Sequence, residues 1–360
     1  MVETEGTETQ RSHRTGISTY RYYNLNRFNI FIHAKPPDEI ATAVRKIVRA
    51  KVSKDRLADL SRIAERLSRK CQEKVTLRSG EDDFFAPLTT AIESLEFERS
   101  CCSNKTRWQM DLEPMNRGPL KYSCETSEVD DDLARPQKRQ RQPATELSNA
   151  MSPRALPPRG GCYTLKIPFP DASIGIHIQY LIEAFSSRVS STNRAKKFFD
   201  FLQDQVASGG HAALVFMPGA STGVAFPFAV VECKSYSSGR LYEAENQAAV
   251  AGACALKIQL DLDSLANNEI TSSSNTQPPL FFSVTTQGSI YQLWSHWTTV
   301  DECGEYSFKS KPVLSCDVLF EKQATKFMVM LHNVFEWGTG PFMTSIVDRL
   351  LEVEKNIGSC

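Results

Sequence analysis

The stretch FPFAVVECKS, residues 226–235, decides how the second half of the chain is interpreted. Its first six residues are apolar or proline, which is typical of a central strand that is buried on both faces. Two ionisable residues, Glu232 and Lys234, then follow with one residue between them. Because side chains alternate along a strand, we expect Glu232 and Lys234 to point to one side of the sheet and Cys233 to the other.

A charged residue at the end of a buried strand is costly unless it is paired or binds a metal. Glu232 and Lys234 could form a strand-end salt bridge, which is the simpler interpretation of so common a pattern. The position of Asp171 favours a metal site over a salt bridge. Residues 163–169 alternate as a strand does, so that Asp171 closes an apolar face. A second carboxylate beside Glu232 would supply the oxygen ligands that Mg²⁺ prefers, although an Asp in this position also commonly starts a turn.

The residues after Lys234 predict a polar loop and then an Ala-rich helix over residues 241–260. Glu243 and Gln247 share one face of this helix, because they lie four positions apart. A stripe of alanines on the opposite face would let the helix approach the sheet closely. The Gln247 amide could hold the attacking water or a phosphate oxygen, or it could be a partly exposed helix residue.

The rest of the second half predicts strands and helices in mixed order. A hairpin is expected around Gln287-Gly288, and its aromatic residues (Trp294, His296 and Trp297) belong to the core or stack on bases. Helices are expected over residues 180–206, 319–337 and 342–354. These elements predict an α/β or α+β fold in which helices flank a central mixed sheet.

Composition divides the chain into four segments. Helical spacing of apolar residues ends where Pro, Ser, Arg and Asp accumulate, and it resumes as strands near residue 163. The predicted segments are a disordered tail (1–35), a helical region that packs on the core (36–102), a disordered linker with a basic cluster (103–160) and the main domain (161–360). The basic helices of the second segment could contact a membrane or a nucleic acid, or present a solvated charged face.

The distribution of charge, the N-terminus and the cysteines indicate which partners, cell compartments and metal sites to expect. Lys+Arg and Asp+Glu each total 42, but residues 161–360 hold 14 basic and 19 acidic residues, so the excess of basic residues lies in the first half. The polar N-terminus resembles no secretory signal, and no apolar run approaches the ~20 residues of a membrane span. The ten cysteines include no CxxC pair, which favours reduced thiols over a zinc site.

These features predict an intracellular protein that does not enter a membrane. The basic cluster at residues 135–141, RPQKRQR, is typical of nuclear import signals, but it is equally compatible with a solvated linker. We expect the protein in the nucleus.

The pattern of Pro170-Asp171, Glu232-Cys233-Lys234 and a helix that bears Gln247 resembles the PD-(D/E)XK nuclease superfamily. More narrowly, residues 226–235 together with Ala-Glu-Asn-Gln at 244–247 are similar to fungal PD-(D/E)XK nuclease-like proteins. The resemblance covers roughly residues 160–340, and the helices at residues 36–98 are similar to those that precede the core in these proteins. It implies a restriction-endonuclease-like core with an N-terminal helical extension.

The resemblance implies metal-dependent hydrolysis of phosphodiester bonds in nucleic acid, with DNA favoured over RNA. Asp171 and Glu232 would bind Mg²⁺ or Mn²⁺, and Glu81, from the first helix of such a core, would be a further ligand. Lys234 would orient the attacking water and stabilise charge on the phosphate. The chain departs from the family in the 60 residues that separate Asp171 from Glu232, where the family has a short hairpin.

Two other interpretations stay open from the sequence. The nuclease fold could have lost catalysis and act as a nuclear factor that binds nucleic acid or protein. The chain could also be an unrelated α/β enzyme, although it contains no Gly-rich phosphate loop or nucleophile elbow.

Overall fold

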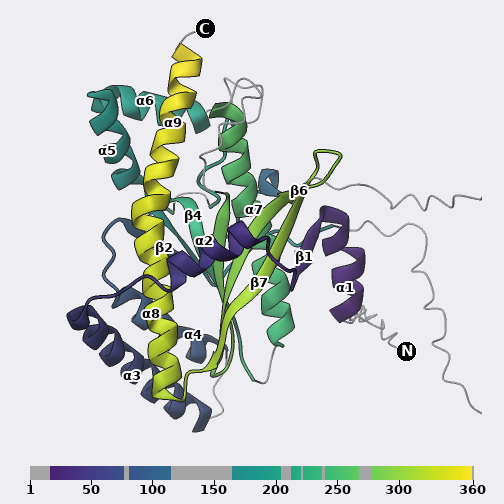
Figure 1. The fold of residues 1–360 in the computed structure, drawn as a ribbon, viewed down its shortest axis with the longest axis vertical. Helices are drawn as coiled ribbons and strands as arrows, with labels where there is room; N and C mark the ends of the chain where they lie inside the picture. The colour runs from purple at the N-terminus through teal and green to yellow at the C-terminus, as the bar shows by residue number, and fades with distance from the viewer. Residues whose placement is uncertain are drawn as a thin grey trace, which may run out of the picture.

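The chain forms a mixed β-sheet with helices on both faces (Figure 1). The computed structural model describes residues 17–76, 81–114, 164–203, 212–219, 222–236, 240–266 and 278–358. Within these ranges the sheet has seven strands, which lie side by side in the order β1 (Ile30–Ile32), β7 (Tyr306–Asp317), β6 (Ile290–Val300), β5 (Leu280–Gln287), β4 (Val224–Lys234), β3 (Ala172–His177) and β2 (Ser100–Asn104). This confirms the predicted α/β class with a central mixed sheet.

Two pairs of neighbouring strands are parallel, β1 with β7 and β4 with β5, and the other four pairs are antiparallel. Parallel neighbours need a crossover connection. Helix α7 (Leu241–Ala266) lies between β4 and β5 in the chain and provides it. The predicted hairpin around Gln287-Gly288 joins β5 to β6, and Gly288 has the positive φ of 57° that this tight turn requires.

The remaining helices cover the sheet and its ends. Their bounds are α1 (Ile17–Tyr23), η1 (Leu25–Phe28), α2 (Asp38–Val48), α3 (Lys54–Thr76), α4 (Glu81–Glu93), η2 (Met110–Leu112), α5 (Ile178–Val189), α6 (Thr192–Gln203), α8 (Glu321–Trp337), η3 (Gly338–Phe342) and α9 (Met343–Gly358). Figure 1 shows α8 and α9 as one long rod. The predicted helices over residues 180–206, 319–337 and 342–354 are therefore present, the first as the pair α5 and α6.

Two neighbouring residues of β5 show which helix covers which face. Phe281 contacts His296, and His296 lies against Gly252 of α7. Phe282 points the other way and packs against Trp337 of α8, with ring centroids 5.4 Å apart. The sheet therefore lies between α7 on one face and α8 on the other, which is why β4 and β5 are buried on both sides.

The predicted strand over residues 163–169 is wrong. Residues 164–170 have no regular secondary structure, and the strand β3 begins at Ala172, just after Asp171. Pro168 and Pro170 have no backbone N–H, so this segment cannot form a full ladder of hydrogen bonds. One of its carbonyl oxygens instead accepts a hydrogen bond from the segment that follows β2, because the amide of Trp108 donates to Pro168 O at 3.0 Å.

The predicted disordered tail is also wrong for residues 17–35. This part of the chain forms α1, η1 and β1, and Leu25, Phe28 and Ile30 are buried in the core. The start of the predicted linker needs the same correction, because residues 103–114 include the end of β2 and η2, and Trp108 is buried. The basic cluster at residues 135–141 lies outside the described residues.

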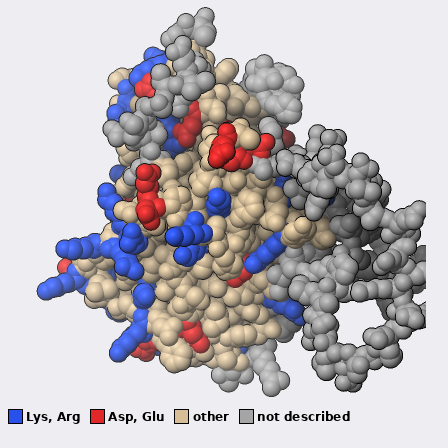
Figure 2. Space-filling model, turned by 45° about the vertical axis from the view of Figure 1, so that its right-hand side comes forward, with Lys and Arg blue, Asp and Glu red and all other residues tan. Residues whose placement is uncertain are grey.

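The helices of the second segment pack on the core as predicted, with the apolar stripe of α3 against α8. The outer face of α3 is charged, with seven Lys and Arg against four Asp and Glu along its length. Figure 2 shows Lys and Arg side chains scattered over the left-hand half of the molecule, with some acidic side chains between them. Among the described helices, none is long and apolar enough to cross a membrane.

Candidate functional site

Asp171 lies beside the end of β4, although 60 residues separate it from Glu232. Strands β3 and β4 are antiparallel, and Ala172 pairs with Val231. Asp171 precedes Ala172, so the register places it next to Glu232. Its Oδ2 accepts a hydrogen bond from the backbone amide of Cys233 at 2.7 Å. The helices α5 and α6 lie within the long connection, and β3 and β4 are still paired, so Asp171 and Glu232 lie together.

Glu232 is the most buried carboxylate of the site, with 2% of its surface exposed. It pairs with Thr285 of β5, and Thr285 pairs with Gln292 of β6. These three side chains form a polar row across the sheet on the face that α7 covers. A buried carboxylate requires charged or hydrogen-bonding partners, and the polar row provides an environment of that kind.

Lys234 is half-buried, and its Nζ donates to the carbonyl oxygen of Cys233 at 2.8 Å. The Cys233 side chain is fully buried, and burial raises the pKa of its thiol well above the ordinary value. Its neighbour in the register is Thr286, whereas Glu232 pairs with Thr285, so the two side chains face opposite layers. The predicted alternation of Glu232, Cys233 and Lys234 is present.

Gln247 and Lys234 line the same cavity, which has a volume of about 460 Å³. The cavity is bounded by α1, by the irregular segment before Asp171 and by the first turns of α7. The Oε1 atom of Gln247 is buried and has no hydrogen-bond partner among the described residues. A buried acceptor without a partner costs about 1–3 kcal/mol. Such an atom is commonly satisfied by a bound water or ligand.

The carboxylates suit Mg²⁺ or Mn²⁺ better than a metal that needs a full set of protein ligands. The described residues contain no group of three or more His, Cys, Asp and Glu side chains that could hold a metal. Mg²⁺ usually keeps several waters and is bound by one or two carboxylates together with substrate phosphate. Asp171 and Glu232 are two carboxylates at one strand end, so the residues present fit that ion.

Comparison with known protein families gives a match over most of the second half of the chain. The model for "Domain of unknown function (DUF7924)" matches residues 129–350, which is more than half of the chain. The chain belongs to this family. A search of curated proteins found no similar sequence. The DUF7924 match spans β3, β4 and α7, so Asp171, Glu232, Lys234 and Gln247 all lie within it.

Glu81 lies before the DUF7924 match, at the first position of α4. Helix α4 packs against β4. The side chain of Glu81 falls outside the described residues, so its role as a further metal ligand stays a prediction.

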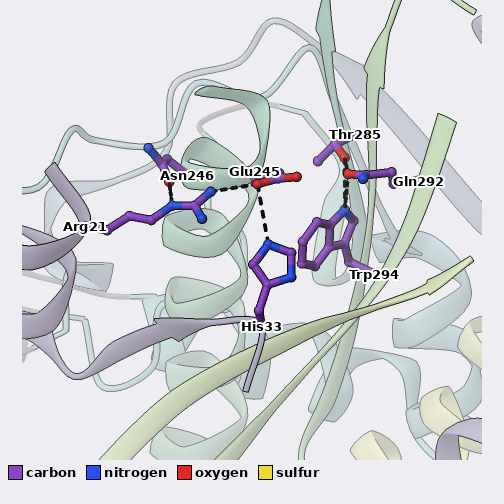
Figure 3. Close-up of polar contacts among 7 residues, drawn as sticks. All are labelled: Arg21, His33, Glu245, Asn246, Thr285, Gln292 and Trp294. Atoms are coloured by element: carbon purple, nitrogen blue, oxygen red, sulfur yellow. Dashed lines mark hydrogen bonds and ion pairs between the residues drawn. The ribbon is translucent and has the colours of Figure 1, made fainter. Parts of the chain in front are cut away.

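Arg21 and His33 also lie before the DUF7924 match, and the sequence did not indicate either residue (Figure 3). Arg21 Nη2 donates to Glu245 Oε2 at 2.6 Å, and Arg21 Nε donates to Asn246 Oδ1 at 2.7 Å. His33 Nε2 lies 3.8 Å from the same Glu245 oxygen. Both residues fall in the segment that was expected to be a disordered tail. The apolar residues at 25, 28 and 30 were the signal that this segment is folded.

The same group of side chains continues to the sheet through Trp294 (Figure 3). Its ring centroid lies 5.0 Å from that of His33, and its Nε1 donates to Thr285 Oγ1 at 2.9 Å and to Gln292 Oε1 at 3.2 Å. Thr285 is the neighbour of Glu232 in the register. The contacts from α1 to β5 therefore end beside the buried carboxylate. Trp294, His296 and Trp297 are all buried, so they belong to the core of this DUF7924 domain.

Proposed function

We propose that this DUF7924 protein is a metal-dependent nuclease that hydrolyses phosphodiester bonds of nucleic acid. Its catalytic centre would consist of Asp171, Glu232 and Lys234. The proposal rests mainly on the contact of Asp171 with the end of β4, which forms although 60 residues separate Asp171 from Glu232. Two carboxylates and a lysine at one strand end are the set that the resemblance to PD-(D/E)XK nucleases implies. DNA is the substrate we favour.

Each residue has a distinct role in the proposed reaction. Asp171 and Glu232 hold the divalent cation, which when bound lowers the pKa of the attacking water and neutralises developing charge. Lys234 orients the water and stabilises negative charge on the phosphate. Gln247 lines the adjoining cavity and holds the water or a phosphate oxygen through its amide.

A buried position for Glu232 is consistent with this role. A divalent cation compensates the charge of a carboxylate that water reaches poorly, and the local field of such an ion is large. Because Asp171 already accepts a backbone hydrogen bond, its carboxylate is held in one orientation before any ligand binds. A preorganised site of this kind does not have to be assembled when the substrate arrives.

The first test is cleavage of single- and double-stranded DNA and RNA in Mg²⁺ or Mn²⁺. We expect Glu232→Gln and Lys234→Ala to lower the rate about 100-fold or more, as is usual when a group that stabilises transition-state charge is removed. Glu352→Gln and Lys355→Ala are matched controls, because these residues form an exposed ion pair on α9, and they should cleave like the wild type.

Calorimetric titration with Mn²⁺ provides the second readout. Binding that weakens in Asp171→Asn and in Glu232→Gln supports the metal site. A folded protein that binds no metal and cleaves no substrate would contradict the nuclease. The nuclear binding factor would then be the better proposal, and the acidic balance of residues 161–360 is compatible with it.

We also propose that the protein acts in the nucleus, on the basis of the basic cluster at residues 135–141. A fluorescent fusion of the full chain should enter the nucleus and should lose this location when Lys138, Arg139 and Arg141 are changed to alanine. A fusion that stays outside the nucleus with the cluster intact would rule this out.

A further inference from the structure

The cavity beside the proposed centre is lined by aromatic and basic side chains. It has a volume of about 460 Å³ and shares Lys234 with the centre. Three aromatic side chains line it, each from a different element: Tyr20 from α1, Phe169 from the segment before Asp171, and Tyr242 from α7. Phe169 precedes Asp171 by two residues, and Lys234 follows Glu232 by two, so the chain leads from the cavity wall to both carboxylates.

The charges around this cavity favour an anion. Lys166 and Lys234 line it together with one carboxylate, Glu243. The guanidinium carbon of Arg240 lies 6.0 Å from the centroid of the Tyr242 ring and adds a further positive charge near the cavity. Aromatic rings beside basic groups suit a ligand that combines a flat ring with a phosphate.

Two amides lie at the same cavity and differ in their contacts. Asn246 is engaged, because its Oδ1 accepts from Arg21 Nε at 2.7 Å. Gln247 Oε1 is buried and has no partner among the described residues. If the Gln247 side chain turns toward the cavity, this acceptor gains a ring N–H or an exocyclic amino group as its donor, and enzymes that bind an unpaired base recognise its edge by such hydrogen bonds.

The size of the cavity limits the form of the nucleic acid. A volume of about 460 Å³ lies in the lower part of the ~300–1,000 Å³ range of pockets for small ligands. A duplex is far too wide to enter it, since the major groove alone is about 12 Å across. One nucleotide can enter only if its base is unpaired.

We infer that the cavity holds one unpaired nucleotide of the substrate, with its base among Tyr20, Phe169 and Tyr242 and its phosphate toward Lys234. This inference rests on the proposed function and narrows the substrate to single-stranded nucleic acid or to unpaired regions of a duplex. Stacking on aromatic side chains is tolerant of sequence, because every base has a π-face. The site is therefore selective for strandedness.

The test measures binding without cleavage, by fluorescence anisotropy of a labelled DNA strand and of its duplex in EDTA. We expect the single strand to bind about 10-fold or more tightly than the duplex, because a base must otherwise be flipped out. Tyr242→Ala should weaken single-strand binding roughly 5-fold or more through the loss of stacking. Phe169→Ala should act in the same direction, and Phe169 is 54% exposed, so this change does not disturb the core.

Two variants serve as controls, and each should bind the single strand within about 2-fold of the wild type. Stacking needs the ring and not the hydroxyl, which is the reason for the first control. Tyr242→Phe keeps the ring in the cavity. Tyr306→Ala removes an exposed tyrosine of β7 that does not line this cavity. Circular dichroism melting checks that every variant is folded.

Equal affinity for single strand and duplex, or normal single-strand binding by both Tyr242→Ala and Phe169→Ala, would overturn the inference. Its failure is distinguishable from failure of the nuclease. Single-strand binding that requires Tyr242, without cleavage of any substrate, keeps the nucleotide site and removes the catalysis. Metal-dependent cleavage with no effect of the cavity variants on binding keeps the nuclease and removes the nucleotide site.

Discussion

His296 shows how a single buried side chain sets the distance between the sheet and α7. The ring is 3% exposed, its Nε2 lies 2.8 Å from Ser283 Oγ, and burial lowers its pKa to about 3. The ring is therefore neutral at physiological pH and is held by a neighbour on β5. Helix α7 passes it at Gly252, where a Cβ atom would lie only 2.4 Å from His296 Nδ1.

We predict that Gly252→Ala destabilises the protein by about 1–2 kcal/mol, because the overlap with a fixed ring outweighs the ~1 kcal/mol that alanine contributes to helix stability. Chemical denaturation measures the change. Gly340→Ala is the control for the overlap, since a Cβ there meets nothing within 4 Å beyond its chain neighbours, and it should lower the free energy of unfolding less than Gly252→Ala does. A Gly252→Ala protein as stable as the wild type would show that α7 can move away from the sheet at no cost.

At the scale of elements, α1 is attached to α7 by the ion pair of Arg21 with Glu245. The side chains of Arg21 and Glu245 are 25% and 10% exposed. Pairs that are exposed contribute about 0–1 kcal/mol, whereas removing one partner of a buried pair costs about 3–5 kcal/mol, so an intermediate value is expected here. Glu245 and Asn246 would both lose their donor if Arg21 were removed.

We predict that Arg21→Ala lowers the free energy of unfolding by about 1–2 kcal/mol and increases hydrogen exchange in α1 and β1. Arg62→Ala is the matched control, because the pair of Arg62 with Asp59 on α3 is exposed, and its loss should cost less than about 0.5 kcal/mol. If both variants lost equally little stability, the Arg21 pair would not hold α1 in place.

At the scale of the whole molecule, the segment of residues 17–35 contributes three large side chains to the core. Leu25, Phe28 and Ile30 are each less than 5% exposed. Strand β1 adds an edge to the sheet, and the amide of Phe308 on β7 donates to Asn29 O at 2.7 Å. Truncating one large buried side chain costs about 2–5 kcal/mol. Removing three of them approaches the ~5–15 kcal/mol that stabilises a typical protein.

We therefore predict that a chain lacking residues 1–35 does not fold cooperatively, as measured by thermal melting and by solubility on expression. A chain that lacks only residues 1–16 keeps α1, η1 and β1 and should melt like the full chain. Cooperative melting of the shorter protein near the wild-type temperature would mean that the segment is an appendage.

The sequence by itself determined the class of fold and the local geometry of the site. Burial of β4 on both faces, the alternation of Glu232 and Lys234 and the helix that carries Gln247 follow from hydrophobic periodicity, which acts over a few residues. The stripe of alanines and the hairpin at Gly288 were predictable for the same reason. Each of these features depends on near neighbours in the chain.

Only the tertiary structure decided which distant segments meet. The adjacency of Asp171 and Glu232 depends on the register of β3 against β4, which an insertion of two helices hides from any local pattern. The contacts of Arg21 and His33 with Glu245 join residues more than two hundred positions apart, in a segment whose polar start resembled a tail. Pairing of this kind is stabilised by burial and hydrogen bonds that exist only once the sheet has formed, so its physical basis lies in the assembled core.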